Sequence, residues 1–120
     1  MPQVYATKEF TRDARRQGIG DDMLCKAADR AERGLIDADY RAGLVKQRVG
    51  RRGAFRVLAA FRAGHRCVFL YSFSKSEREN IDDDELAHWR KIAGAFLQMR
   101  PEKLQELIEA GELREVMCDE

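Results

Sequence analysis

Apolar and polar residues alternate along the chain with two periods, one of about two residues and one of about 3.6, which predict strands and helices respectively. The two-residue period over residues 3–7 predicts a short strand, and helical spacing follows over residues 8–17 until Gly18 interrupts it. A second helix is expected from Asp21, taken as its N-cap, to Gly34 just beyond its end. Its buried face should consist of Leu24, Ala27, Ala28 and Ala31.

The middle of the chain contains three further segments with strand periodicity, at residues 44–49, 54–62 and 66–75. The turn residues 63–65 join the last two segments, and the basic link 50–53 (Gly-Arg-Arg-Gly) joins the first two. Because both connections are short, we expect an antiparallel meander of these strands.

Helical spacing returns in the last third of the chain. Asp82 to Asp84 should open a helix, because carboxylates are favoured at a helix N-terminus. The apolar stripe of this helix should cover one face of the sheet, and it consists of Leu86, Trp89, Ala93, Phe96 and Leu97. Pro101 is expected to begin a final helix that ends at Gly111, and residues 113–117 form either an added strand or a loose tail.

These elements predict an α+β fold: an N-terminal strand and two helices, then an antiparallel β-meander, then C-terminal helices. The length of 120 residues fits a single domain. We expect a core domain over residues 1–100, with residues 101–120 as a helical extension of it.

Charge is distributed unevenly along the chain, although the total is only +1. Residues 41–78 hold ten Lys and Arg residues and one acid, whereas both flanks are acidic. This basic section favours a local surface for phosphate groups. The alternative is a strand surface that arginine keeps hydrated.

Strand periodicity places several of these cations on one face. Lys46 and Arg48 share a face of the first meander strand, and Arg56 lies on the corresponding face of the second. Lys75 and Arg78 follow at the exit of the third strand. Such a cluster would stabilise the charge that gathers on a phosphodiester during cleavage.

Other kinds of site find little support in the sequence. The glycines form no nucleotide-binding pattern, so no cofactor is expected. No metal site is expected either, because the three cysteines lack metal-ligand spacing and should be free thiols: Cys25, Cys67 and Cys118. No apolar run approaches the length of a membrane span and no secretory signal is visible, so we expect a cytoplasmic protein without membrane contact.

Five segments of the basic section and its continuation resemble the RelE/ParE toxin superfamily, and most of all its RelE/HigB-like branch, whose signature is Phe-x-Lys-x-Glu-x-x-Asn-Ile. The segments are residues 44–49, 53–56, 69–75, 77–78 and 80–86. The resemblance implies the toxin of a type II toxin-antitoxin module, an endoribonuclease that cleaves mRNA, commonly on the translating ribosome. It also implies a cognate antitoxin, expected to be of the helix-turn-helix type, as a partner beside mRNA and the ribosome.

The resemblance also implies roles for individual residues. Lys46 and Arg48 match a basic pair, of which Lys46 would act on the attacking 2′-hydroxyl. Arg56 would hold the scissile phosphate, and Arg78 would be a second clamp on it. Four further residues are expected to bind substrate, namely Arg51, Arg52, Lys75 and Tyr71.

Two departures from the family pattern leave parts of the site open. The link 50–53 is shorter than in many relatives, and no late tyrosine or histidine is present as a general acid, apart from His88. The acid is therefore open among Lys75, Tyr71 and His88. Three other functions also stay open: a gyrase-poisoning toxin of the ParE type, a non-catalytic nucleic-acid-binding protein, and a toxin that has lost activity.

Overall fold

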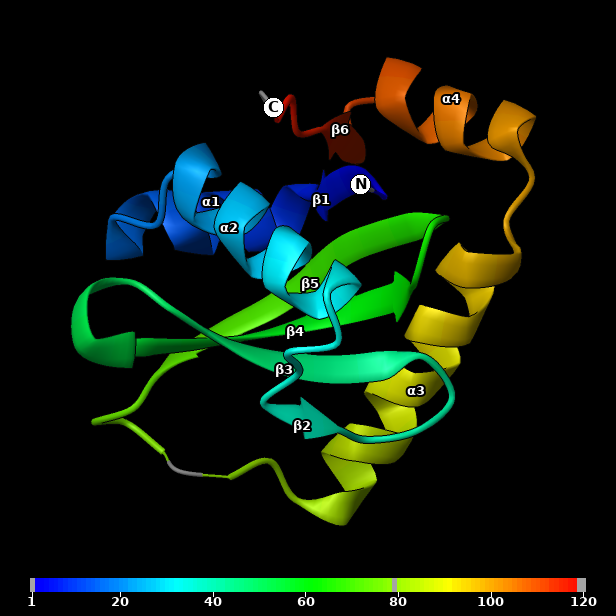
Figure 1. The fold of residues 1–120 in the computed structure, drawn as a ribbon. Helices are drawn as coiled ribbons and strands as arrows, with labels where there is room; N and C mark the ends of the chain where they lie inside the picture. Colours follow the sequence, from blue (N-terminus) through cyan, green and yellow to red (C-terminus); the bar gives the residue numbers. More distant parts are fainter. Residues whose placement is uncertain (1, 79, 119–120) are drawn as a thin grey trace.

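A computed structural model describes residues 2–78 and 80–118 of the chain, and it contains a central β-sheet with helices on both faces (Figure 1). The elements are, in chain order, β1 (Gln3–Thr7), α1 (Lys8–Gln17), α2 (Asp21–Glu32), β2 (Ala38–Asp39), β3 (Leu44–Val49), the 3-10 turn η1 (Arg51–Gly53), β4 (Phe55–Arg62), β5 (Arg66–Ser74), α3 (Asp83–Gln98), α4 (Pro101–Glu109) and β6 (Leu113–Glu115). The predicted α+β class is confirmed.

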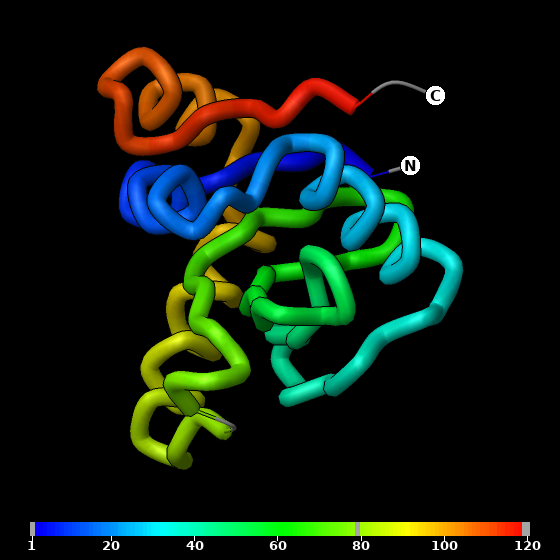
Figure 2. Tube along the Cα trace, turned by 90° about the vertical axis from the view of Figure 1, so that its left-hand side faces the viewer, coloured from blue at the N-terminus to red at the C-terminus, as the bar shows by residue number. Residues whose placement is uncertain are grey.

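The sheet has the strand order β2-β3-β4-β5-β1-β6. β2 to β5 form the expected antiparallel meander, extended by the short β2 that the sequence did not indicate. β1 runs parallel to β5 and antiparallel to β6, so the first and the last strand of the chain lie side by side (Figure 2). Of the two alternatives for residues 113–117, the added strand is therefore correct.

α1 and α2 cover one face of the sheet. Thr7 caps α1 by accepting a hydrogen bond from the backbone N–H of Phe10, and the Phe10 ring packs at 5.5 Å from that of Phe69 in β5. The expected N-cap of α2 is wrong: Gly20 occupies that position without a side-chain bond. Asp21 instead forms an ion pair with Arg114 of β6 at 2.8 Å, because β6 lies close to the start of α2.

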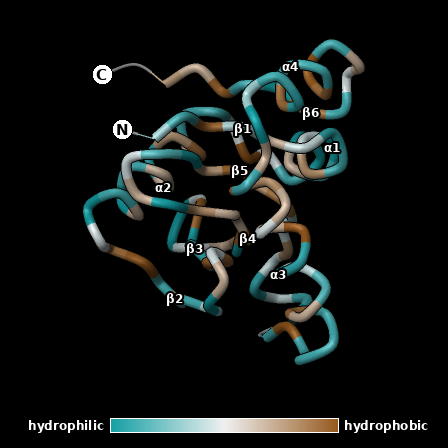
Figure 3. The backbone as a smooth tube through the Cα atoms, turned by 90° about the vertical axis from the view of Figure 1, so that its right-hand side faces the viewer, coloured by the Kyte–Doolittle hydropathy of each residue, from teal (hydrophilic) through white to brown (hydrophobic). Residues whose placement is uncertain are grey.

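α3 covers much of the opposite face, as its apolar stripe predicts. Asp82 caps this helix by accepting from the backbone N–H of Glu85 at 2.9 Å. Figure 3 shows hydrophobic positions (brown) between hydrophilic ones (teal) along α3 and α4, as expected for helices that pack on one side only. The buried residues beneath α3 include Leu44, Leu58 and Val68. α3 thus covers part of the sheet face that carries Lys46 and Arg48.

Arg66 is buried, with 3% of its surface exposed, although it belongs to the basic section of the sequence. Its guanidinium donates to the carbonyl oxygens of Phe96 (2.6 Å) and Met99 (2.9 Å) at the end of α3. Arg66 therefore satisfies carbonyls at a helix C-terminus and takes no part in a basic surface.

Cys25 and Cys118 form a disulfide, so the expectation of three free thiols is wrong for this pair. The pairing of β6 with β1 carries the segment after β6 alongside α2, where the two Cα atoms are 5.6 Å apart. Because the two cysteines are 93 residues apart along the chain, the sequence did not indicate that they are in contact. Cys67 is a free cysteine in the core, and burial raises the pKa of its thiol to about 12.

A β-bulge in β5 changes which residues face which helices. Leu58 pairs with Tyr71 while Ala59 pairs with Phe69, so one extra residue, Leu70, is inserted in β5. Before the bulge Phe69 packs on the side of α1 and α2, whereas after it Phe73 packs on the side of α3. After Leu70, the side chains of β5 therefore face the opposite sides of the sheet from those that uninterrupted alternation would give them.

None of the helices within residues 2–78 and 80–118 combines the length and the apolar character that a membrane span requires.

Candidate active site

A cavity of about 270 Å³ lies at the end of the sheet where β3 ends, β4 begins and β5 ends. It is lined by the three cations that strand periodicity placed on one face, by the two expected at the exit of the third meander strand, and by one carboxylate. The lining residues are Asp37, Lys46, Arg48, Arg56, Lys75 and Arg78.

The register of β3 and β4 explains how three of these cations meet. Lys46 and Arg48 alternate with residues that point to α2, and Arg48 pairs directly with Arg56 across the two strands. Lys46 also lies 5.7 Å from the centre of the Tyr40 ring, a cation–π contact. Three cationic groups are thereby held on rigid strands rather than on mobile loops.

The bulge at Leu70 adds the fourth cation. With uninterrupted alternation, Lys75 would point to the side of α1 and α2, as Phe69 does. The extra residue turns it to the other face, where it lines the cavity. The backbone N–H of Lys75 donates to the carbonyl of Ala54 at 3.0 Å, which fixes the chain at this point.

Gly53 allows the two arginines of neighbouring strands to approach each other. Its φ is +63°, and a Cβ atom there would lie 3.3 Å from Cδ of Arg48 and 3.6 Å from Nη1 of Arg56. Arg56 donates to the carbonyl of Gly53 and, at 3.4 Å, to that of Phe55. Arg56 is therefore half-buried and stabilises the link 50–53. Its expected position on an open strand face did not suggest this second role.

Arg78 is partly neutralised by a carboxylate of α3. Its guanidinium donates to both oxygens of Glu85, at 3.2 and 2.5 Å, and lies 5.7 Å from the centre of the Phe73 ring. The hydrogen bond and charge of Glu85 raise the pKa of Arg78 above its ordinary value, and the hydroxyl of Tyr71 adds to this effect. A phosphate that binds Arg78 must compete with Glu85.

Asp37 is a site residue that sequence reasoning missed. Its carboxylate accepts a hydrogen bond from the backbone N–H of Arg48 at 2.6 Å and lies 3.9 Å from that residue's Nε. Its own N–H donates at 2.8 Å to the side-chain carbonyl of Gln47, which is 1% exposed. The signal in the sequence was a glutamine at a core-facing position of a strand, since a buried amide needs polar partners.

Two other expected residues, Tyr71 and His88, lie outside the lining of this cavity. Tyr71 stacks on Trp89, with ring centres 5.3 Å apart. His88 is exposed on α3 with its ring at the edge of Trp89. Of the three candidates for the general acid, Lys75 alone lines the cavity among the described residues.

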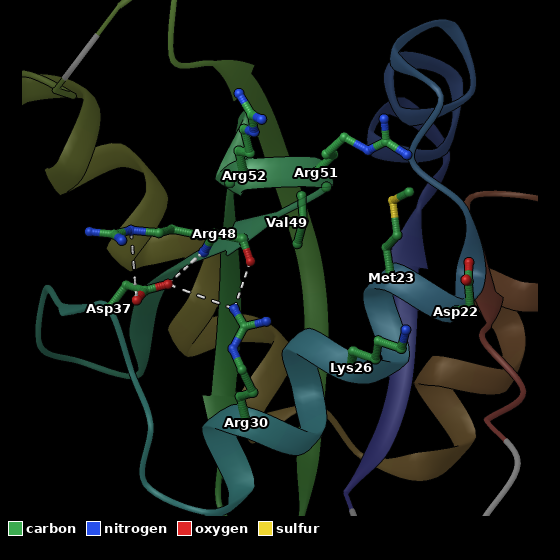
Figure 4. Close-up of a pocket in the computed structure, with 11 residues that line it drawn as sticks. Asp22, Met23, Lys26, Arg30, Asp37, Arg48, Val49, Arg51 and Arg52 are labelled. Carbon is green, nitrogen blue, oxygen red and sulfur yellow. Dashed lines mark hydrogen bonds and ion pairs between the residues drawn. The ribbon is translucent and has the colours of Figure 1, made fainter.

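Arg51 and Arg52 line a second, larger cavity of about 460 Å³ between η1 and α2. Figure 4 shows this cavity, with Arg51 extended towards Met23 and Arg48 pointing the opposite way. Arg48 and Asp37 line both cavities, which are therefore neighbours.

The donor set of the first cavity suits an anion. Five cationic side chains face a single carboxylate there, among the residues that the structure describes. Within the same residues, no group of three or more His, Cys, Asp or Glu side chains gathers as metal ligands do. The arrangement can bind a phosphate through several charge-assisted hydrogen bonds.

Comparison with protein families identifies the chain. Residues 2–116 match the family described as the RelE toxin of the RelE/RelB toxin-antitoxin system, and the chain therefore belongs to the RelE toxin family. It is the toxin of a toxin-antitoxin pair, and an antitoxin is its partner. No curated protein and no solved structure matches it.

Proposed function

We propose that the protein is an mRNA interferase, an endoribonuclease that cuts mRNA on the translating ribosome and so stops protein synthesis. One observation carries the proposal: cations from β3, from β4 and from the loop after β5 surround one cavity of about 270 Å³. Dispersed solubilising arginines would not be expected to meet in this way. The cavity groups match the catalytic set of the RelE-like branch, in which RNA is the target.

The proposed reaction is attack of a ribose 2′-oxygen on the adjacent phosphorus. The bond from phosphorus to the 5′-oxygen breaks, leaving a 2′,3′-cyclic phosphate and a 5′-hydroxyl. Lys46 activates the 2′-hydroxyl electrostatically, and the proton that this hydroxyl releases passes to water. Arg48, Arg56 and Arg78 stabilise the negative charge that develops on the non-bridging oxygens, without a metal ion or other cofactor.

Lys75 is our candidate for the proton donor to the leaving 5′-oxygen. It lines the cavity, and its ammonium group carries protons that it can donate. Tyr71 lies beside Arg78 and takes a substrate-binding role in this proposal, as do Arg51 and Arg52 in the neighbouring cavity.

We assign all catalytic groups to residues 1–100 and treat residues 101–120 as an extension of the same domain. Leu104 of α4 and Leu113 of β6 are buried, so the extension packs on the domain. The net charge of the extension is negative, which disfavours a place in an RNA-binding cleft. An antitoxin of the helix-turn-helix type completes the proposed module.

The test compares Lys46→Ala with Arg62→Ala, each purified and added to ribosomes programmed with a reporter mRNA. Arg62 is an exposed cation on the same sheet, at the far end of β4 from the cavity. We expect Lys46→Ala to lower the cleavage rate by about 100-fold, the usual effect of removing one group that stabilises the transition state. Arg62→Ala should cut at the wild-type rate, and primer extension locates the cuts.

Several results would refute the proposal. Equal cleavage by the two variants would show that the cavity is not the active site. Growth arrest with intact mRNA and damaged DNA would favour a gyrase-directed toxin. Binding of RNA without any cleavage by the wild type would indicate a non-catalytic or inactive protein.

A further inference from the structure

The cavity between α2 and η1 is the second concentration of positive charge on the molecule. Five cationic side chains line it, three from the sheet and its link and two from α2: Arg48, Arg51, Arg52, Lys26 and Arg30. The two residues of α2 lie outside the basic section of the sequence and have no role in the first cavity. Figure 4 shows Arg30 reaching from α2 towards Arg48.

The helical period of α2 explains why these side chains face the link. Met23, Lys26 and Arg30 stand at positions i, i+3 and i+7, so they form one stripe along the helix. The neighbouring stripe, which contains Leu24 and Ala27, is buried against the sheet and fixes the rotation of the helix. The stripe of Met23, Lys26 and Arg30 is therefore held at the rim of the cavity.

The backbone of the link directs its two arginines outwards. Gly50, Arg52 and Gly53 all have positive φ angles, of 83°, 57° and 63°. For Arg52 this left-handed conformation is costly, and such strain is concentrated at functional sites. The resulting tight turn exposes the side chains of Arg51 and Arg52.

The carboxylates of the cavity leave most of this charge uncompensated. Asp37 lies 3.8 Å from Arg30, which also donates to the carbonyl of Arg48 at 2.6 Å, so these groups hold the cavity wall together. Lys26, Arg51 and Arg52 form no ion pair with any carboxylate of residues 2–78 and 80–118. These three cations remain available to a bound anion.

The two cavities meet at Arg48 and Asp37. The guanidinium of Arg48 extends away from the second cavity (Figure 4). The backbone carbonyl of the same residue accepts a hydrogen bond from Arg30 in the second cavity. A chain of phosphates that places one member in the first cavity can thus continue directly into the second.

From this geometry we infer that the cavity between α2 and η1 is a second phosphate subsite, which holds a nucleotide flanking the bond to be cut. Lys26, Arg51 and Arg52 bind the flanking phosphate, and Met23 offers an apolar surface to the attached ribose or base. This inference rests on the proposed function, because it assumes that the first cavity holds the scissile phosphate of a single-stranded RNA.

The experiment measures binding of 2′-O-methyl RNA, which lacks the attacking hydroxyl and cannot be cleaved, by fluorescence anisotropy at several salt concentrations. One probe is a dinucleotide with a single phosphodiester, and the other contains about eight nucleotides. The double variant Lys26→Ala/Arg51→Ala is compared with Arg62→Ala/Lys103→Ala, which removes the same charge from exposed positions outside both cavities. Thermal melts verify that both variants are folded.

We expect the Lys26/Arg51 double variant to bind the longer probe more weakly than the control does. The slope of log K against log salt should fall by about 0.7 for each phosphate that the protein no longer neutralises, hence by about 0.7 for the single flanking phosphate. The dinucleotide should bind both variants equally, because it occupies the first cavity alone.

Other outcomes would overturn the inference. Equal binding of the longer probe by both double variants would show that the second cavity holds no phosphate, and equal weakening for both probes would indicate only a general effect of charge. A wild type that binds neither probe would refute the subsite and weaken the proposed function with it. Length-dependent binding without cleavage of ordinary mRNA would retain the subsite and reject the nuclease.

Discussion

Replacing the buried Gln47 by methionine tests how the fold holds the loop before β3. The side chain is 1% exposed and makes three hydrogen bonds. Its amide nitrogen donates to the carbonyls of Ala27 (3.1 Å) and Leu35 (3.0 Å), and its oxygen accepts from the N–H of Asp37 (2.8 Å). Methionine preserves the unbranched shape and removes all three bonds.

Each of these hydrogen bonds contributes about 1 kcal/mol net, and the apolar replacement recovers part of the loss by burial. We therefore expect Gln47→Met to lower the free energy of unfolding by about 2 to 3 kcal/mol. For a chain of 120 residues this corresponds to a fall in Tm of about 8 to 12 °C. Circular dichroism melts and urea titrations of the purified protein measure both quantities.

The matched control is Gln105→Met, at an exposed position of α4, which should change the free energy of unfolding by less than about 0.5 kcal/mol. A Gln47→Met protein as stable as this control would refute the reasoning, since the buried amide would then contribute nothing. Because Asp37 loses its anchor, we also expect weaker positioning of the carboxylate beside Arg48.

Three other predictions concern single groups. Replacing Cys25 and Cys118 by serine should lower the free energy of unfolding by about 2 to 4 kcal/mol, since the disulfide closes a loop of 93 residues; equal melts with and without reductant in the wild type would contradict this. Cys67, whose pKa burial raises to about 12, should resist iodoacetamide at about pH 8 until the protein is denatured, and mass spectrometry detects the adduct; rapid labelling of the folded protein would show that the thiol is accessible. Glu85→Gln should tighten binding of uncleavable RNA by up to about fivefold, because Arg78 then loses a competing ion pair that contributes at most about 1 kcal/mol. Weaker binding in the anisotropy assay would indicate that Glu85 orients Arg78 productively.

The elements with a regular period could be predicted from the sequence, and the contacts between distant segments could not. The stripe of α3 and the alternation in β3 are visible because one face of each is apolar and the other is polar. In β5 both faces are buried, so residues 67–73 form an uncharged, mostly apolar run in which the alternation is invisible. The bulge at Leu70, and with it the direction of Lys75, therefore left no sign in the sequence.

The candidate site likewise contains residues whose positions could be predicted from the sequence and residues whose positions could not. The grouping of Lys46, Arg48 and Arg56 follows from strand periodicity alone, since neighbouring strands keep their register over short distances. Asp37 enters the cavity through a loop that Gln47 anchors, and Lys26 enters the second cavity through the packing of α2. Such placements depend on tertiary contacts, which local patterns do not encode.

The position of β1 in the sheet also determines when the fold can be completed during synthesis. β1 is made first, yet its two neighbours are β5, which ends at Ser74, and β6, which begins only at Leu113. A nascent chain can pair the meander that carries the candidate site from nearby residues, because β3 to β5 are consecutive. The pairing of β1 is therefore completed only after β6 has emerged, and until then one edge of β1 stays unpaired. The cation cluster can therefore form before the sheet is closed, because the sheet is complete only after residues 113–115 have been made and have left the ribosome.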